Sequence, residues 1–136
     1  KGYSRFLKLV SYSKVAIVVL AEEGNHDALG RIVNALEFAK ELKEKDHEVG
    51  IIFAGAGTTF IPALENKDHK AHGIYKSVED VIDGACEFCS NAFGVLDEVK
   101  KTNIELLSEF DNHPSLEKYI AQGYQGLPIK KNSLVL

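Results

Sequence analysis

The chain has 136 residues, of which 45% are hydrophobic and 26% are charged, and its net charge at pH 7 is −4. A chain of this length folds as one domain and can bury a core without disulfides or a structural metal. The acidic charge and the lack of a basic stripe argue against nucleic-acid binding, and no apolar run approaches the roughly eighteen residues of a membrane-spanning helix. Two cysteines make no disulfide scaffold, which favours a reducing compartment, the cytoplasm.

The N-terminal segment has one property of a secretory signal peptide, because basic residues precede an apolar run at residues 15–21. The run is only seven residues long, and Glu22 and Glu23 follow where small residues would precede a cleavage site. We therefore interpret the run as a buried strand. We expect residues 1–13 to be an N-terminal extension and residues 14–136 to form a single α/β domain, since no linker rich in Gly, Pro or Ser divides them.

The first half of the chain predicts a strand, a helix and a second strand. The β-branched run at residues 15–20 is typical of a central parallel strand, and residues 27–45 carry apolar side chains at helical spacing. Residues 49–54 form the second apolar run, which completes a βαβ unit with a right-handed crossover. We expect a short helix at residues 58–64, capped by Thr58, and an exposed polar loop at residues 65–76.

Two interpretations of the next segment remain open. In the first, residues 77–101 are mostly helical, with Ser77 as the N-cap and a possible break at Gly84. In the second, residues 81–86 form a short strand and a helix starts at Cys86. The choice decides whether Cys86 lies at the start of a helix or inside one.

The last part of the chain continues the alternation of strands and helices. It predicts a strand at residues 104–110, a turn at 111–114, a helix at 115–122 and a last strand at 125–130. Pro128 restricts that last strand to an edge of the sheet. Alternating strands and helices with short connections predict a parallel α/β sandwich.

The two cysteines are the strongest candidates for chemistry. Cys86 and Cys89 are the only cysteines in the chain, and a spacing of three residues places them on one face of a helix. There they can react with each other, bind one metal ion or exchange a sulfur atom. The alternative is two small buried hydrophobic side chains. We favour the reactive or ligating use, because a CxxC pair carries its chemistry in its spacing.

Other candidate sites are weaker. His69 and His72 add two ligands to the cysteines and complete a possible four-ligand zinc set, but a chain with its own core needs no metal to fold, so we expect neither metal nor cofactor. The loop at residues 24–27 follows a central strand, and residues 55–59 resemble half of a phosphate-binding loop. We interpret these segments as a solvated loop and a tight turn. Asp111, Asn112 and His113 follow a predicted strand and could enter an active site from the carboxyl edge of the sheet. Their position before a helix that starts at Pro114 favours a role in capping that helix.

The cysteine segment resembles a known protein family. Cys86 stands eight residues before Gly94-Val95, with Cys89 and Phe93 between them. This pattern resembles the small CxxC-bearing branch of the DsrE/DsrF-like family of sulfur-relay proteins. Weaker agreements with the family lie at residues 53–57, 113–116 and 123–125.

The resemblance implies a flavodoxin-like three-layer sandwich with a mostly parallel sheet of about four to five strands. It also implies a homo-oligomer, often a trimer or a hexamer. In the sulfur-relay members, the residue corresponding to Cys86 accepts a sulfane sulfur as a persulfide and passes it to a protein partner. Cys89 has no counterpart in the best-understood members. It would resolve a Cys86 persulfide by forming a disulfide and releasing sulfide.

These implications lead to two hypotheses on function. The first is a sulfur-relay protein, at most a sulfurtransferase-like carrier, with Cys86 and Cys89 as its catalytic residues and a protein donor or acceptor as its partner. The alternative is an oligomeric binding or structural α/β protein without catalysis, whose cysteines are structural or ligate a metal. A thioredoxin-like oxidoreductase is less well supported, because Glu87 and Phe88 between the cysteines, which include an acidic charge, are unlike that family's motif.

Overall fold

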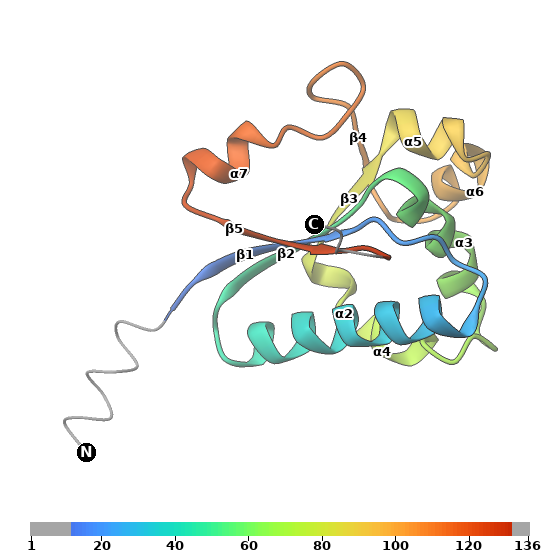
Figure 1. Ribbon diagram of the computed structural model, residues 1–136, viewed down its shortest axis with the longest axis horizontal. Coiled ribbons are helices and arrows are strands. Elements are labelled where there is room, and N and C mark those ends of the chain that lie inside the picture. Colours follow the sequence, from blue (N-terminus) through green and yellow to red (C-terminus); the bar gives the residue numbers. More distant parts are fainter. Residues whose placement is uncertain (1–11, 132–136) are drawn as a thin grey trace.

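The sheet is the centre of the molecule. The computed structural model describes residues 12–131, so residues 1–11 of the expected extension and residues 132–136 of the expected domain lie outside it. The strands are β1 (Lys14–Val19), β2 (Glu48–Phe53), β3 (Ile82–Cys86), β4 (Leu106–Leu107) and β5 (Gln125–Ile129). They lie in the order β4-β3-β2-β1-β5, and every pairing is parallel (Figure 1). The predicted flavodoxin-like α/β sandwich is confirmed.

The helices cover both faces of the sheet. They are α2 (His26–Glu44), α3 (Phe60–Glu65), α4 (His72–Ser77), α5 (Glu87–Ala92), α6 (Leu96–Lys100) and α7 (Glu117–Ala121), with the short 3-10 helices η1 (Gly55–Thr59) and η2 (Glu79–Val81). In Figure 1, α2 and α4 lie on one side of the sheet and α7 lies on the other. No helix within residues 12–131 is both long enough and apolar enough to cross a membrane.

The main core lies between the sheet and α2. Alternate side chains of a strand point to the same face, so Ile17 and Val19 of β1 and Phe53 of β2 all point toward α2, where they are fully buried. Ile32 and Leu36 meet them from α2. Each such side chain contributes about 1.5–3 kcal/mol through burial. The predicted βαβ unit is therefore confirmed, and the apolar periodicity that predicted it is the periodicity that packs the core.

The second face of the sheet has a smaller core. Ala16 and Ile52 pack there with Tyr119 of α7. The Tyr119 hydroxyl donates a 2.6 Å hydrogen bond to a carboxylate oxygen of Asp83 on β3. Gly50 of β2 makes room for this carboxylate, because a Cβ at Gly50 would overlap it. This bond ties α7 to the sheet and fixes the segment that leads into α7.

Two predictions for the middle of the chain are wrong. Residues 65–76 were expected to form an exposed loop, but they include α4, whose Tyr75 is fully buried and donates a hydrogen bond to Glu65. The helix is only six residues long and most of its residues are polar, so the sequence shows no helical apolar pattern there. Thr58 does not cap α3, since its hydroxyl donates to the carbonyl of Gly55 instead.

The second interpretation of residues 77–101 is the one that the structure shows. Ser77 ends α4, and its hydroxyl donates to the carbonyl of Ile74, so the prediction that Ser77 caps a long helix is wrong. A strand, β3, follows, and α5 begins directly after Cys86. Gly84 allows β3 and the next strand to approach, because a Cβ at Gly84 would lie 2.5 Å from the carbonyl oxygen of Glu105.

The last elements are confirmed with shorter bounds. The strand predicted at residues 104–110 comprises only the two residues of β4, and residue 110 belongs to a tight turn at residues 110–113. The helix α7 occupies five of the eight residues predicted for it. The strand β5 lies at the edge of the sheet, as Pro128 requires.

Gly57 gives a direct test of the packing where β1 ends. A Cβ at Gly57 would overlap the backbone carbonyl of Val19, and backbone atoms cannot move aside as a flexible side chain can. We expect Gly57→Ala to lower the free energy of unfolding by about 1–3 kcal/mol in urea denaturation. Gly30, on the exposed surface of α2 with open space around it, is the matched control. Gly30→Ala is expected to raise stability by about 0.5–1 kcal/mol; equal effects of the two substitutions would contradict this packing.

Candidate functional site

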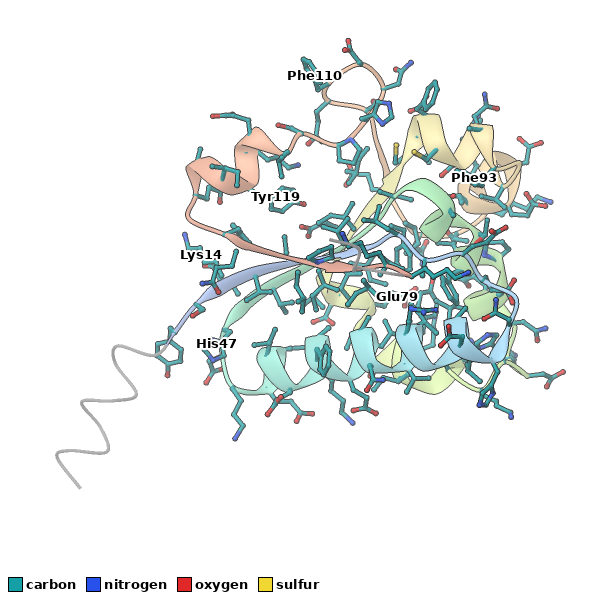
Figure 2. The ribbon with its side chains drawn as sticks, in the orientation of Figure 1. Lys14, His47, Glu79, Phe93, Phe110 and Tyr119 are labelled. Carbon is teal, nitrogen blue, oxygen red and sulfur yellow. The ribbon has the colours of Figure 1, made fainter. Side chains whose placement is uncertain are left out.

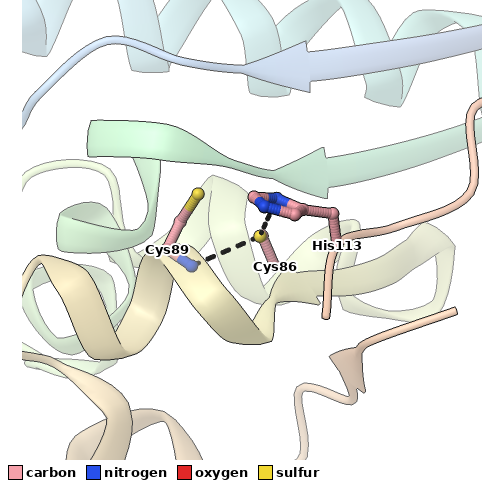
Figure 3. A group of neighbouring side chains, drawn as sticks. All are labelled: Cys86, Cys89 and His113. Atoms are coloured by element: carbon pink, nitrogen blue, oxygen red, sulfur yellow. Dashed lines mark hydrogen bonds between the residues drawn. The ribbon is translucent and has the colours of Figure 1, made fainter. Parts of the chain in front are cut away.

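Cys86 lies at the junction of a strand and a helix. It is the last residue of β3 and the N-cap of α5, and its Sγ accepts a 3.3 Å hydrogen bond from the backbone N–H of Cys89 (Figure 3). The buried hydroxyl of Ser90 donates to the carbonyl of Cys86 at 2.8 Å, which fixes this junction. The carboxyl edge of a parallel sheet is where α/β proteins bind ligands. The thiol therefore lies where the fold favours a site, at the start of a helix.

A tight turn carries His113 to the same place. Phe110 and His113 exchange two backbone hydrogen bonds of 2.9 and 2.8 Å. Between them, Asp111 and Asn112 have positive φ angles of 50° and 64°, as a type I′ turn requires. Asp and Asn adopt this left-handed conformation more readily than other residues with a side chain. The Asn112 carbonyl also accepts a 3.0 Å hydrogen bond from the N–H of Phe88, which attaches the turn to the first turn of α5.

Cys86, Cys89 and His113 form one cluster. The Sγ atom of Cys86 lies 3.2 Å from Nδ1 of His113 and 3.8 Å from the carbonyl oxygen of Asn112. One ligating atom from each of the three side chains lies within 4.8 Å of the others (Figure 3). The His113 ring packs on the ring of Phe88, with 4.8 Å between their centroids. The two predicted site residues are therefore brought together, and a histidine that we interpreted as part of a cap joins them.

The surroundings of Cys86 favour the protonated form of its thiol. Burial raises the pKa of the Cys86 thiol to about 11, and the neighbouring Cys89 thiol acts in the same direction. The N–H groups of Cys89 and Phe88 lower the pKa, as expected at the start of a helix, but burial outweighs them. The thiol is thus protonated near neutral pH. A nucleophilic thiolate forms when a nearby base takes the proton, and Nδ1 of His113 is at hydrogen-bond distance for that transfer.

The two thiols differ in access. Cys86 is fully buried, whereas Cys89 is partly exposed. Cys89 is therefore the more accessible thiol of the two, and Cys86 is shielded from solvent. The exposed Phe110, at the turn that carries His113, points away from the sheet (Figure 2).

An apolar pocket of about 280 Å³ adjoins the cluster on the second face of the sheet. Residues 113–116, in the segment between β4 and α7, form one part of its lining. The remaining lining residues come from β1, the end of β2 and the residue after it, α7, and β5 with the residue before it. These are Ala16, Val18, Ile52, Ala54, Tyr119, Ile120, Tyr124 and Gly126. The His113 side chain thus contacts the Cys86 thiol and also borders a cavity. Leu116 and Ile120 at this pocket are largely exposed.

The other candidates from the sequence do not join the cluster. His69 accepts a hydrogen bond from the N–H of Ala71, and His72 pairs with the carbonyl of Leu64. The four-ligand zinc set of His69, His72 and the cysteines, which we considered and did not favour, is not assembled among the described residues. Residues 24–26 of the loop border a separate pocket together with His69 and Lys70. Residues 55–59 form η1, the tight turn that we expected, next to α5.

Of the two roles considered for residues 111–113, the capping role that we favoured is wrong for His113. The helix α7 begins after Leu116, so His113 lies outside it and does not cap it. A signal was present, since Cys86 and His113 each follow a predicted strand, and the carboxyl ends of neighbouring parallel strands meet at one edge of the sheet. That inference needed the strand interpretation of residues 81–86 and the knowledge that β3 and β4 are neighbours.

Comparison with known proteins gives one informative match. No model of a known protein family matches the chain, and no solved structure matches it. The chain is 31% identical over 115 residues to Uncharacterized protein MJ0733 of Methanocaldococcus jannaschii, over 84% of this chain and 93% of that protein. This chain belongs to the family of MJ0733. The name of MJ0733 states no activity. The chemistry of the cluster is therefore inferred from its residues.

The difference in access between the two thiols is measurable. In the folded, reduced protein we expect Cys89 to be alkylated at least about tenfold faster than Cys86, because Cys86 is buried and its raised pKa leaves little thiolate at neutral pH. Peptide mass spectrometry over a time course gives both rates, and protein in denaturant serves as the reference. Faster alkylation of Cys86 in the folded protein would contradict the arrangement described above.

The turn that places His113 can be tested with two substitutions at one position. Asn112 has a φ of 64°, which glycine adopts freely and a β-branched residue does not. We expect Asn112→Val to lower stability by about 1–2 kcal/mol and to accelerate alkylation of Cys86, because the turn that covers it is disturbed. Asn112→Gly is the control and is expected to leave the alkylation rate unchanged. Identical rates in the two variants would show that the turn does not cover the thiol.

Proposed function

We propose that this protein is a sulfur carrier of the DsrE/DsrF-like family, which holds a sulfane sulfur as a persulfide on Cys86 and passes it to a protein partner. The observation that carries the proposal is the 3.2 Å contact between Cys86 Sγ and His113 Nδ1, with the Cys89 thiol within reach. A thiol, a base and a second thiol are the groups that thiol–persulfide exchange uses. The CxxC pattern and its position before Gly94 support the same function.

Sulfur enters through the accessible thiol. The Cys89 thiolate attacks the outer sulfur of a donor persulfide, a new S–S bond forms on Cys89, the S–S bond of the donor breaks, and the donor leaves as a thiolate that takes up a proton. His113 Nδ1 then accepts the Cys86 proton, and the Cys86 thiolate attacks the outer sulfur on Cys89. This second exchange leaves the persulfide on Cys86 and returns the Cys89 thiolate, which takes the proton back from His113. The N–H of Cys89, which already donates to Cys86 Sγ, stabilises the transient negative charge on that atom.

Two routes release the sulfur. In the first, the sulfur returns to Cys89 by the reverse exchange, and a partner thiolate attacks its outer sulfur and carries it away. In the second, the Cys89 thiolate attacks Sγ of the Cys86 persulfide, so that a Cys86–Cys89 disulfide forms and sulfide leaves. The two cysteine sulfurs are then oxidised and the sulfane sulfur is reduced, which balances the electrons.

The surface beside the cluster supports a protein partner. Phe110, Leu116 and Ile120 are exposed apolar side chains near the turn and α7. We propose that such surfaces serve donor and acceptor proteins and the homo-oligomer, a trimer or a hexamer, that the family resemblance implies. Reduced thiols are required for the exchange, so we place the protein in the cytoplasm. Sedimentation-equilibrium analysis measures the number of subunits directly.

Intact-mass spectrometry tests the function. Reduced, chelator-treated protein is incubated with polysulfide, and the donor is removed by gel filtration. We expect the wild type to retain one added sulfur that a thiol reductant removes. The loaded proteins are then treated briefly with a limiting amount of a small thiol. Cys86→Ser is expected to lose its sulfur in this step while the wild type retains it, because the thiol can attack a persulfide on the partly exposed Cys89 but not one on the buried Cys86. Cys89→Ser is expected to load more slowly.

Two results would overturn the proposal. One is a wild type that retains no sulfur under these conditions. The other is a Cys86→Ser variant that retains as much sulfur as the wild type. Either result favours the alternative, an oligomeric binding or structural protein without catalysis.

A further inference from the structure

The same cluster has the composition of a soft-metal site. Two thiols and an imidazole supply three ligands, and their ligating atoms lie within 4.8 Å of one another. No other group of three His, Cys, Asp or Glu side chains in residues 12–131 has this spacing. Thiolate and imidazole ligands favour zinc over magnesium or calcium, which prefer oxygen ligands. The donor set therefore indicates zinc.

The distances fit a zinc ion with little adjustment. With zinc–sulfur bonds of about 2.3 Å and zinc–nitrogen bonds of about 2.1 Å, ligand atoms in a tetrahedral site stand about 3.5–3.8 Å apart. The Cys86 Sγ–His113 Nδ1 distance of 3.2 Å is slightly shorter, and every separation in the cluster is below 4.8 Å. Small side-chain rotations, of Cys89 above all, are sufficient to bring the three atoms into coordination.

Each ligand is already held in orientation by the fold. The Cys89 N–H donates to Cys86 Sγ, a bond that a thiolate ligand accepts at least as well as a thiol. His113 is fixed by the type I′ turn and by its contact with the Phe88 ring. The three side chains come from the end of β3, the first turn of α5 and the turn after β4. Side chains held in this way lose little conformational entropy when the ion binds.

We propose that Cys86, Cys89 and His113 bind one Zn²⁺ ion through two thiolates and Nδ1 of the imidazole. The two thiol protons are released when the ion binds. Three protein ligands leave a fourth position of the tetrahedron open to water or to an incoming thiolate, as in zinc sites that bind exchangeable ligands. The inference goes beyond the proposed function and does not depend on it. Because both uses need the same sulfurs, bound zinc excludes sulfur loading.

Zinc titration of the full-length, reduced protein tests the proposal. Metal-free protein competes with a chromophoric zinc indicator, and native mass spectrometry gives the stoichiometry. We expect one Zn²⁺ per chain, and no binding of Mg²⁺. Loss of a residue that only orients a ligand weakens metal binding about 10- to 100-fold. Loss of a direct ligand should weaken zinc binding by at least that factor. We test this with the variants Cys86→Ser, Cys89→Ser and His113→Gln, each of which removes one direct ligand.

The control variant is His26→Gln, an exposed histidine at the start of α2 that lies outside the cluster. It is expected to bind zinc as the wild type does. A wild type that binds no stoichiometric zinc would overturn the proposal, as would cysteine variants that bind like the wild type. The variants could lose zinc binding because they misfold, so a second measurement uses the wild type alone. One equivalent of Zn²⁺ is expected to slow the alkylation of both thiols in the wild type.

The test is separable from the test of the proposed function. Sulfur loading is measured on chelator-treated protein, and zinc binding is measured without any sulfur donor. If the protein binds zinc but loads no sulfur, only the proposed carrier function is overturned. If it loads sulfur but binds no zinc, only the proposed metal site is overturned.

Discussion

The hydrogen bond from the Phe88 N–H to the Asn112 carbonyl connects the two segments that make the site. Phe88 lies in the first turn of α5, directly after Cys86, and Asn112 lies in the turn that follows β4. The pairing of β3 with β4 brings the two segments to the same edge of the sheet, and this bond fixes one segment against the other. With it, His113 is positioned against the thiol, and its ring is packed on Phe88. This backbone contact, together with the β3–β4 pairing, places the base beside the thiol.

Burial and hydrogen bonding act on Cys86 in opposite directions. Burial keeps the proton on the thiol at rest, while the N–H groups at the start of α5 favour the anion. A thiol in this balance is inert until a base or a metal ion removes its proton, and it is stabilised once the proton has gone. His113 and the partly exposed Cys89 are placed to control that step. This balance explains why one cluster suits both sulfur exchange and zinc binding.

The sequence predicted the parts of the fold whose pattern is local. The β-branched run that forms β1 and the amphipathic run that forms α2 each contain their own evidence, and both elements were predicted within two residues. The helix α4 was missed because its buried Tyr75 stands among polar residues. The segment ending at Cys86 fitted a helix and a strand equally, because short apolar runs have no decisive period.

The candidate site was predicted only in part for a related reason. The CxxC pair is visible in the sequence as a local pattern, so both cysteines were found. His113 is 27 residues from Cys86, and their contact depends on strand order and on an unusual turn with two positive φ angles. Neither property is encoded near the cysteines. Contacts of this kind become visible only when the sheet is assembled.

Long-range ¹H–¹⁵N NMR spectra of the histidine ring nitrogens test the central claim most directly. If Nδ1 of His113 is bonded to the Cys86 sulfur, its ¹⁵N resonance shifts in Cys86→Ala, while the resonance of His72, which pairs with Leu64, stays in place. Such a selective shift is the result that the structure predicts. A His113 resonance that is the same in the wild type and in Cys86→Ala would contradict the contact on which the site is built.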